Sequence, residues 1–233
     1  MFSTINKIYP KFLEYLPKFD GIPALLIRLY LAPVFIIAGY NKLNFSDPDV
    51  TGFASLFANT NIVTWFGNTE WGLGLPFPEL LANLAAWTEF LGGWLLLIGL
   101  LTRLVSIPLM FTMIIAMMSV HVDNGWFAIT PTNADTSPAK VMSWLGFKQA
   151  EVSLQNSEEA AIRLNRIKEI IVENGDPNWL YEKRSIVILN NGIEFAMTYF
   201  IMLLALFFIG AGRFTSIDYY LRKRLCHSIC SQK

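Results

Sequence analysis

Four long apolar stretches alternate with polar connections along the 233-residue chain. A transmembrane α-helix needs about 20 predominantly apolar residues. Membrane spans are therefore predicted at about residues 22–40, 78–101, 104–120 and 193–212. The first span contains Arg28, and the second contains Glu89. This pattern predicts an all-α fold, an integral membrane four-helix bundle that forms a single domain over residues 1–233.

A long polar insert, at about residues 123–190, separates the third and fourth spans. We expect an amphipathic helix in its middle, because Ser157 is a suitable N-cap and Gly175 is a suitable stop. The apolar side chains of this helix recur at helical spacing: Leu164, Ile167 and Ile171. By contrast, only Thr102 and Arg103 separate the second and third spans, which predicts a tight antiparallel hairpin.

Positive charges near the span ends predict how the chain lies in the membrane. With four spans, both termini and the turn at Arg103 lie on one side. The basic residues of that side are Lys7, Lys11, Lys18, Arg103, Arg213, Arg222, Lys223, Arg224 and Lys233. The short loop on the opposite side carries only Lys42. By the positive-inside rule, both termini are predicted to be cytoplasmic and the insert extracytoplasmic. We expect the membrane to be a bacterial inner membrane.

The composition supports a membrane protein. Hydrophobic residues make up 54% of the chain and charged residues 15%, whereas a soluble domain carries about 25% charged residues. Lysine and arginine together number 18, equal to the 18 acidic residues, so no net positive field points to nucleic acid. Two cysteines are too few for a disulfide framework. The basic run at residues 222–224 suits anionic lipid headgroups, and membrane lipids are the partners that the composition predicts.

Two ionisable side chains inside the spans are candidates for function. At 1.5 Å per residue, Arg28 lies about 9 Å along its span and Glu89 about 15 Å along its own. Charged groups in hydrocarbon cost a few kcal/mol, so they usually face partners or water. One interpretation is a buried structural pair between Arg28 and Glu89. The other is a proton-handling carboxylate beside a ligand pocket that Trp87 and Trp94 line.

A second polar group is expected where the spans meet the outer surface. Its members are Asn41, Lys42, Glu79, His121, Asp123, Asn190, Asn191 and Glu194. Helix ends at an interface are normally polar, but a histidine near carboxylates can also bind a metal or relay a proton. Met113 and Met117 precede His121 at a spacing of four, which places the three side chains on one helix face. Two thioethers and an imidazole are suitable ligands for Cu(I). A methionine stripe is more often core filler than a copper site.

Short motifs along all four spans resemble the DoxX family of four-helix membrane proteins. The motifs are Ile27-Arg28-Leu29, Gly39-Tyr40-Asn41-Lys42, Glu89-Phe90-Leu91-Gly92-Gly93, Gly99-Leu100-Leu101-Thr102-Arg103, and His121 with Asn124-Gly125-Trp126. More closely, the chain resembles the HvfX-like branch of that family. The stretches that carry this resemblance are 28–42, 65–78, 106–126 and 188–195.

The resemblance implies two alternative functions. DoxX relatives include a quinone-linked thiosulfate oxidoreductase subunit, which implies a quinone as cofactor. In that case the candidate catalytic residues are Glu89, Arg28 and His121. The candidate cofactor contacts are Arg28, Glu89, Trp87, Trp94, Lys42 and Glu194.

HvfX-like members accompany pathways for copper-binding modified peptides and their iron-dependent maturation enzyme. This association implies an accessory protein that docks the peptide or the enzyme at the membrane, with His121, Met117 and Met113 as candidate copper ligands. The sequence has no haem, flavin or dinucleotide motif and no thioredoxin-like cysteine pair. That lack favours the accessory role.

Overall fold

The computed structural model describes residues 10 and 19–230, and their side chains apart from those of Ser46 and residues 226–230. Several residues singled out above therefore lie outside the described part: Lys7, Lys11, Lys18, Lys233 and the side chains of Cys226 and Cys230. The described residues are mostly helical and form no strand. The predicted all-α fold is confirmed.

In the described part of the chain, three helical stretches are long and apolar enough to cross a membrane. They are α2 (Gly21–Lys42), α4 (Pro78–Ile98) and the continuous stretch Thr102–Asn124. The last stretch begins with α5 (Thr102–Ala116) and ends in a π-helical turn (Met117–His121) and a 3-10 turn (Val122–Asn124). The fourth predicted span corresponds to α9 (Glu194–Ile209), an apolar helix of 16 residues. Because α9 is shorter than the usual spanning length of about 20 residues, three of the four spans have the expected length.

The chain divides into two compact units. The first comprises residues 1–114 and 199–233, and the second comprises residues 115–198. Besides the spans, the first unit contains η2 (Asn44–Ser46), η3 (Gly52–Leu56), α3 (Thr60–Gly67) and α10 (Ile217–Cys230). The second contains η6 (Ala134–Thr136), α6 (Ala139–Trp144), α7 (Lys148–Asn174) and α8 (Pro177–Tyr181).

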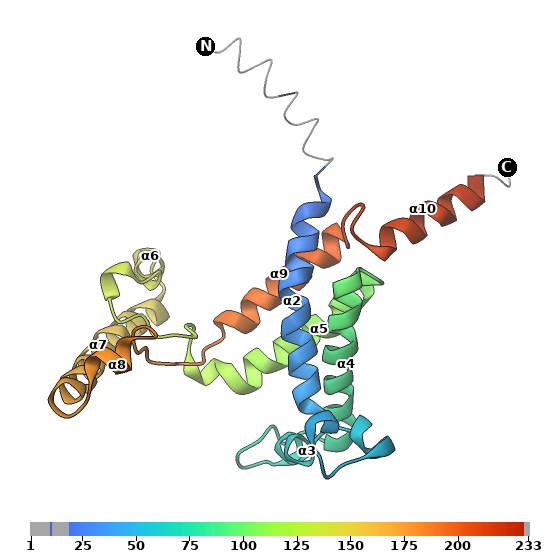
Figure 1. Cartoon of the computed structure of the whole chain (residues 1–233). Helices are drawn as coiled ribbons and strands as arrows, with labels where there is room; N and C mark the ends of the chain where they lie inside the picture. Colours follow the sequence, from blue (N-terminus) through green and yellow to red (C-terminus); the bar gives the residue numbers. More distant parts are fainter. Residues whose placement is uncertain (1–9, 11–18, 231–233) are drawn as a thin grey trace. The chain divides into compact units, whose positions relative to one another are not determined.

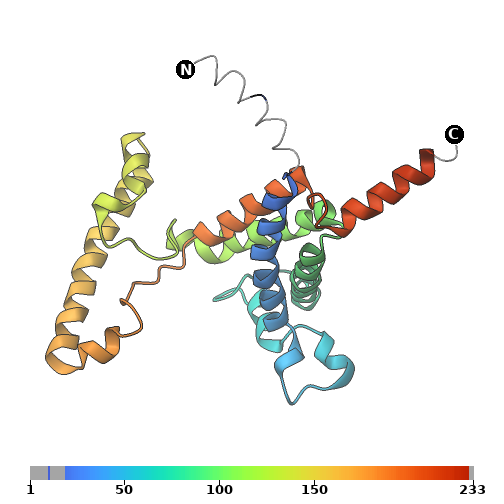
Figure 2. The same cartoon turned by 45° about the horizontal axis from the view of Figure 1, so that its top comes forward.

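In the first unit, α2 and α4 lie side by side and antiparallel, as Figure 1 and Figure 2 show. Glycines let the two backbones come close. A Cβ atom on Gly39 would lie 2.3 Å from the backbone nitrogen of Phe90, and one on Gly93 would lie 2.7 Å from that of Ile36. Small residues at helix interfaces allow this close packing in membranes, where no hydrophobic effect drives helices together.

A tight turn joins α4 to α5, as the sequence predicts. Gly99 ends α4 with a φ of 68°, a left-handed conformation that glycine adopts readily. A residue of α10 caps the N-terminus of α5. The carboxylate of Asp218 accepts hydrogen bonds from the amides of Leu101 and Thr102 at 2.7 and 2.9 Å. Asp218 is thus an N-cap from elsewhere in the chain, and it fastens α10 to the hairpin.

The main helix of the second unit differs from the prediction at one end. Helix α7 ends before Gly175, as expected, but it begins at Lys148 rather than near Ser157. Ser157 lies inside the helix and is fully buried, and its hydroxyl donates to the carbonyl of Ser153 at 3.0 Å. This bond to the preceding turn satisfies the hydroxyl within a helix, so the serine does not start one.

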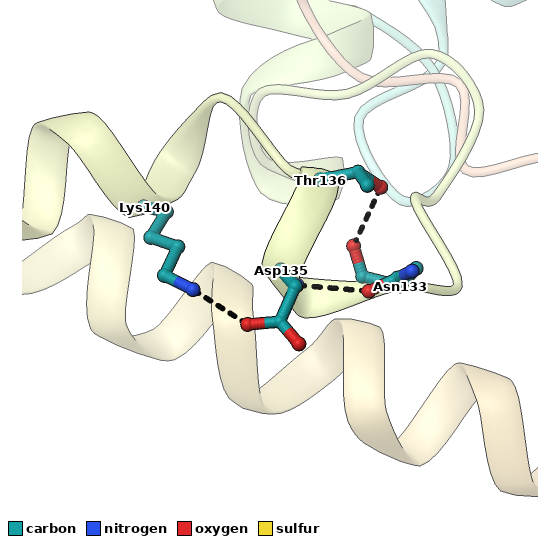
Figure 3. A network of polar contacts seen from close by, with 4 residues as sticks. All are labelled: Asn133, Asp135, Thr136 and Lys140. Carbon is teal, nitrogen blue, oxygen red and sulfur yellow. Dashed lines mark hydrogen bonds and ion pairs between the residues drawn. The ribbon is translucent and has the colours of Figure 1, made fainter.

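A small polar network closes the turn before α6 (Figure 3). The Asn133 side chain accepts a hydrogen bond from the amide of Asp135 at 2.9 Å, and Lys140 donates to the Asp135 carboxylate at 2.5 Å. The hydrogen bond and the charge of Lys140 lower the pKa of the Asp135 carboxyl. The pair is at the surface, so it orders the turn but adds little to stability and weakens with salt.

The close approach of α2 and α4 gives a direct test. Replacing Gly39 or Gly93 by alanine should destabilise the protein by about 1–3 kcal/mol, because the new methyl group meets backbone that cannot move aside. Gly92→Ala is the matched control, since its methyl group meets only the Leu109 side chain, at 3.1 Å. Thermal unfolding in detergent measures the difference, and an equal loss in all three variants would contradict this packing.

Candidate functional site

The buried guanidinium of Arg28 connects α2 to two other segments of the first unit by hydrogen bonds. Arg28 is 1% exposed, and four of its five N–H groups donate to backbone carbonyls. Two of these carbonyls end α4, and two belong to the segment between α9 and α10. The acceptors are Leu96 at 2.9 Å, Leu97 at 3.2 Å, Ala211 at 2.5 Å and Thr215 at 3.0 Å. The positive charge also suits the negative end of the α4 dipole.

The predicted pair between Arg28 and Glu89 is wrong. In the antiparallel packing, Glu89 lies level with residues near Gly39, so the rise of 1.5 Å per residue separates the two groups by about 15 Å along α2. Side chains lean toward the N-terminus of their own helix. In antiparallel helices this lean carries Arg28 and Glu89 away from each other, and each therefore finds a different partner.

Glu89 forms an ion pair with Lys42 at the C-terminal end of α2. The Glu89 side chain is 7% exposed and that of Lys42 is 24% exposed, so the carboxylate is buried and the ammonium remains accessible from one side. Two predicted site residues are thus brought together, although the sequence placed them in different groups. The lean of Lys42 toward the α2 N-terminus brings its long side chain to the level of Glu89.

Four aromatic rings close in sequence to this charged pair pack on one another. Phe45 contacts Tyr40, Trp87 and Phe90, with ring centroids 5.5, 6.1 and 5.3 Å apart. The indole N–H of Trp87 donates to the carbonyl of Leu56 at 2.9 Å, which holds this ring in place. Sequence reasoning missed Tyr40, Phe45 and Phe90, although two of them are direct neighbours of predicted site residues. We call these four rings, with Lys42 and Glu89, the Lys42–Glu89 site.

Other predicted residues do not join this site. Trp94 is 47% exposed on α4, as expected for a ring that faces lipid. Met113 is buried in α5, but the helix changes to π geometry from Met117 to His121. Copper binding by Met113, Met117 and His121 stays a prediction. Among the described residues, no group of three or more histidine, cysteine or acidic side chains can hold a metal.

His121 and Glu194 belong to the second unit, where the side chain of each forms a hydrogen bond with the backbone. The Nδ1 atom of His121 lies 2.8 Å from the carbonyl oxygen of Asn191. Because a carbonyl only accepts hydrogen bonds, Nδ1 carries a proton. The carboxylate of Glu194 accepts a hydrogen bond from the amide of Ala128 at 2.9 Å. These bonds join residues 121–128 to residues 190–194 and make a structural role the direct explanation for both side chains.

A double-mutant cycle tests the Lys42–Glu89 pair. Glu89→Leu should destabilise the protein by about 3 kcal/mol, because it leaves a partly buried ammonium without a counter-charge. The double variant Lys42→Met with Glu89→Leu should recover most of that loss. Glu79→Leu, at an exposed position of α4, is the control. Unfolding free energies in detergent measure the cycle, and a double variant less stable than Glu89→Leu alone would refute the pairing.

Comparison with known proteins places the charged pair inside a recognised domain. The DoxX family model matches residues 24–122 and so includes α2, α4 and α5, with Arg28 and the Lys42–Glu89 site. No curated protein and no solved structure matches the chain. The family match and the three apolar helices of spanning length agree on a protein embedded in a membrane. The similarity to the DoxX family thus covers residues 24–122.

Proposed function

We propose that the DoxX domain binds the head group of a lipid-soluble quinone at the Lys42–Glu89 site and that the chain is a quinone-linked membrane redox subunit. The observation that carries this proposal is the buried carboxylate paired with a partly exposed ammonium inside an apolar domain. Burying a charged pair is costly and seldom adds stability over apolar side chains. Intramembrane ionisable groups therefore usually serve a function.

The residues present fit a quinone head group. An ammonium has three N–H donors, so Lys42 can donate to a carbonyl oxygen while it remains paired with Glu89. The Glu89 carboxylate can accept and return a proton beside that oxygen. The faces of Tyr40, Phe45, Trp87 and Phe90 offer apolar contacts for a flat ring.

When bound, a quinone takes up two electrons and two protons and becomes a quinol. A dithiol or a redox partner protein supplies the electrons in this proposal. Low local dielectric strengthens the hydrogen bonds that Lys42 and Glu89 make with the head group. Arg28 has no direct part, because four carbonyls already occupy its guanidinium; it positions the helices that carry the site.

The orientation belongs to the same proposal. The excess of Lys and Arg near the termini favours cytoplasmic ends in a bacterial inner membrane. Lys42 then lies at the outer end of α2. A quinone in the outer half of the bilayer reaches this position from the lipid.

Quinone content of the purified protein tests the proposal. The full chain, isolated in mild detergent, should retain about one quinone per chain after organic extraction and chromatography. Lys42→Gln and Glu89→Gln should each lower this content at least tenfold, because each removes a polar contact to the head group. Trp87→Phe should lower it less, since the ring face remains.

The matched controls are Glu79→Gln and Trp94→Phe, which change exposed positions of the same helix. Both controls should retain the quinone content of the unaltered chain. If Glu89→Gln keeps its quinone and loses only stability, the pair is structural and the proposal fails. A chain without quinone in every preparation from native membranes also contradicts it.

A different observation favours a second function, that of an accessory protein for a copper-binding modified peptide and its iron-dependent maturation enzyme. Between α6 and α7, the second unit exposes consecutive large apolar side chains: Trp144 is 73% exposed and Leu145 is 68% exposed. Exposed apolar clusters commonly mark protein interaction sites. The resemblance to HvfX-like proteins suggests which partners dock there.

Co-purification with the peptide precursor or the iron enzyme tests this second function. The combined change Trp144→Ser with Leu145→Ser should reduce capture at least tenfold, because anchors of this size dominate binding energy. Trp179→Ser, which alters an equally exposed tryptophan of the same unit, should reduce it less than twofold. Capture by neither partner, or equal capture by all variants, would refute the accessory role.

A further inference from the structure

A pocket of about 440 Å³ lies in the first unit, among the start of α5, the end of α9 and the start of α10. It lies at the end of α2 opposite Lys42, so it is separate from the Lys42–Glu89 site. Its charged side chains are Arg103, Asp218 and Arg222. Its volume falls in the range of small-ligand sites, which is about 300–1,000 Å³.

Two of these charges are available to a ligand and one is not. The Asp218 carboxylate is occupied by the amides of Leu101 and Thr102 at the N-terminus of α5. Arg103 uses one terminal nitrogen to donate to the carbonyl of Phe208 at 3.0 Å, which orients the guanidinium. The ion pairs among the described residues include neither Arg103 nor Arg222. The pocket therefore offers two cations, and one of them, Arg103, is held in place by a hydrogen bond.

Gly210 makes room for one of them. A Cβ atom at this position would lie 3.2 Å from the Nε atom of Arg103, and the φ of Gly210 is 81°. A larger residue would be strained there and would press on the guanidinium. The backbone after α9 thus leaves the side of Arg103 open toward the pocket.

Part of the remaining wall is apolar and exposed. Leu101, Leu104 and Ile209 all line the pocket and are about half exposed or more. They belong to helix ends of an apolar domain, where headgroups and acyl chains of the bilayer meet. A soluble anion would leave these side chains uncovered, whereas an amphiphile covers them and brings its charge to the arginines.

We propose that this pocket is a binding site for one anionic phospholipid, with its phosphodiester between Arg103 and Arg222. Guanidinium groups bind phosphate oxygens with paired, charge-assisted hydrogen bonds. The acyl chains of the lipid lie over Leu104 and Ile209. The lipid thereby bridges α5 and α10, which Asp218 already joins.

Native mass spectrometry of the full chain in neutral detergent tests the proposal with defined lipids. Phosphatidylglycerol should bind as one molecule per chain and at least tenfold more tightly than phosphatidylcholine. Arg222→Gln should weaken binding of phosphatidylglycerol about fivefold or more, the effect expected for one basic residue. Arg224→Gln is the matched control, because it removes the same charge from an exposed position of α10 that does not line the pocket.

These outcomes distinguish a specific lipid-binding site from general attraction of anionic lipid to the basic surface. Equal weakening by Arg222→Gln and Arg224→Gln, or equal affinity for both lipids, overturns the proposal. Competition by glycerol 3-phosphate or inorganic phosphate at lipid-like concentrations also overturns it, because the site then takes a soluble phosphate. Arg103→Lys, which keeps the charge but loses the paired hydrogen bonds, should also weaken binding severalfold, and its thermal midpoint checks that the hairpin is intact.

Discussion

The buried guanidinium of Arg28 is the interaction on which the first unit depends. In an apolar domain, a charged side chain needs a full set of partners, and helix ends leave carbonyls that need donors. Arg28 meets both requirements at once, because it binds the end of α4 and the segment that follows α9. Three distant parts of the chain are joined by one side chain, and the backbone contacts at Gly39 and Gly93 complete the alignment of α2 with α4.

The second charge within the apolar helices, Glu89, is stabilised differently from Arg28. Arg28 is enclosed by backbone groups that cannot change protonation state. Glu89 is paired with a single side chain, Lys42, which keeps partial access to its surroundings. A pair of titratable groups beside aromatic rings can exchange protons and contacts with a ligand, whereas a guanidinium bound to four carbonyls cannot. The two charges that looked equivalent in the sequence therefore have different surroundings.

The sequence predicted the apolar helices, the tight hairpin and the end of α7 at Gly175, because each depends on local pattern. It did not predict the partners of Arg28 and Glu89, since these depend on the register of antiparallel helices and on the direction in which side chains lean. The start of α7 was misplaced because Ser157 is a good cap by type but satisfies its hydroxyl within the helix. The π-helical turn after Ala116 is invisible to a spacing argument, and so is the cap that Asp218 supplies from residues far along the chain.

That cap has a mechanical consequence. The carboxylate of Asp218 holds two amides at the first turn of α5, and the amide of Asp218 itself donates to the carbonyl of Gly99 at 3.0 Å. The C-terminal helix cannot swing away without exposing the first turn of a membrane helix, at a cost of about 1 kcal/mol for a lost cap. A force applied to α10 is therefore transmitted to the turn between α4 and α5.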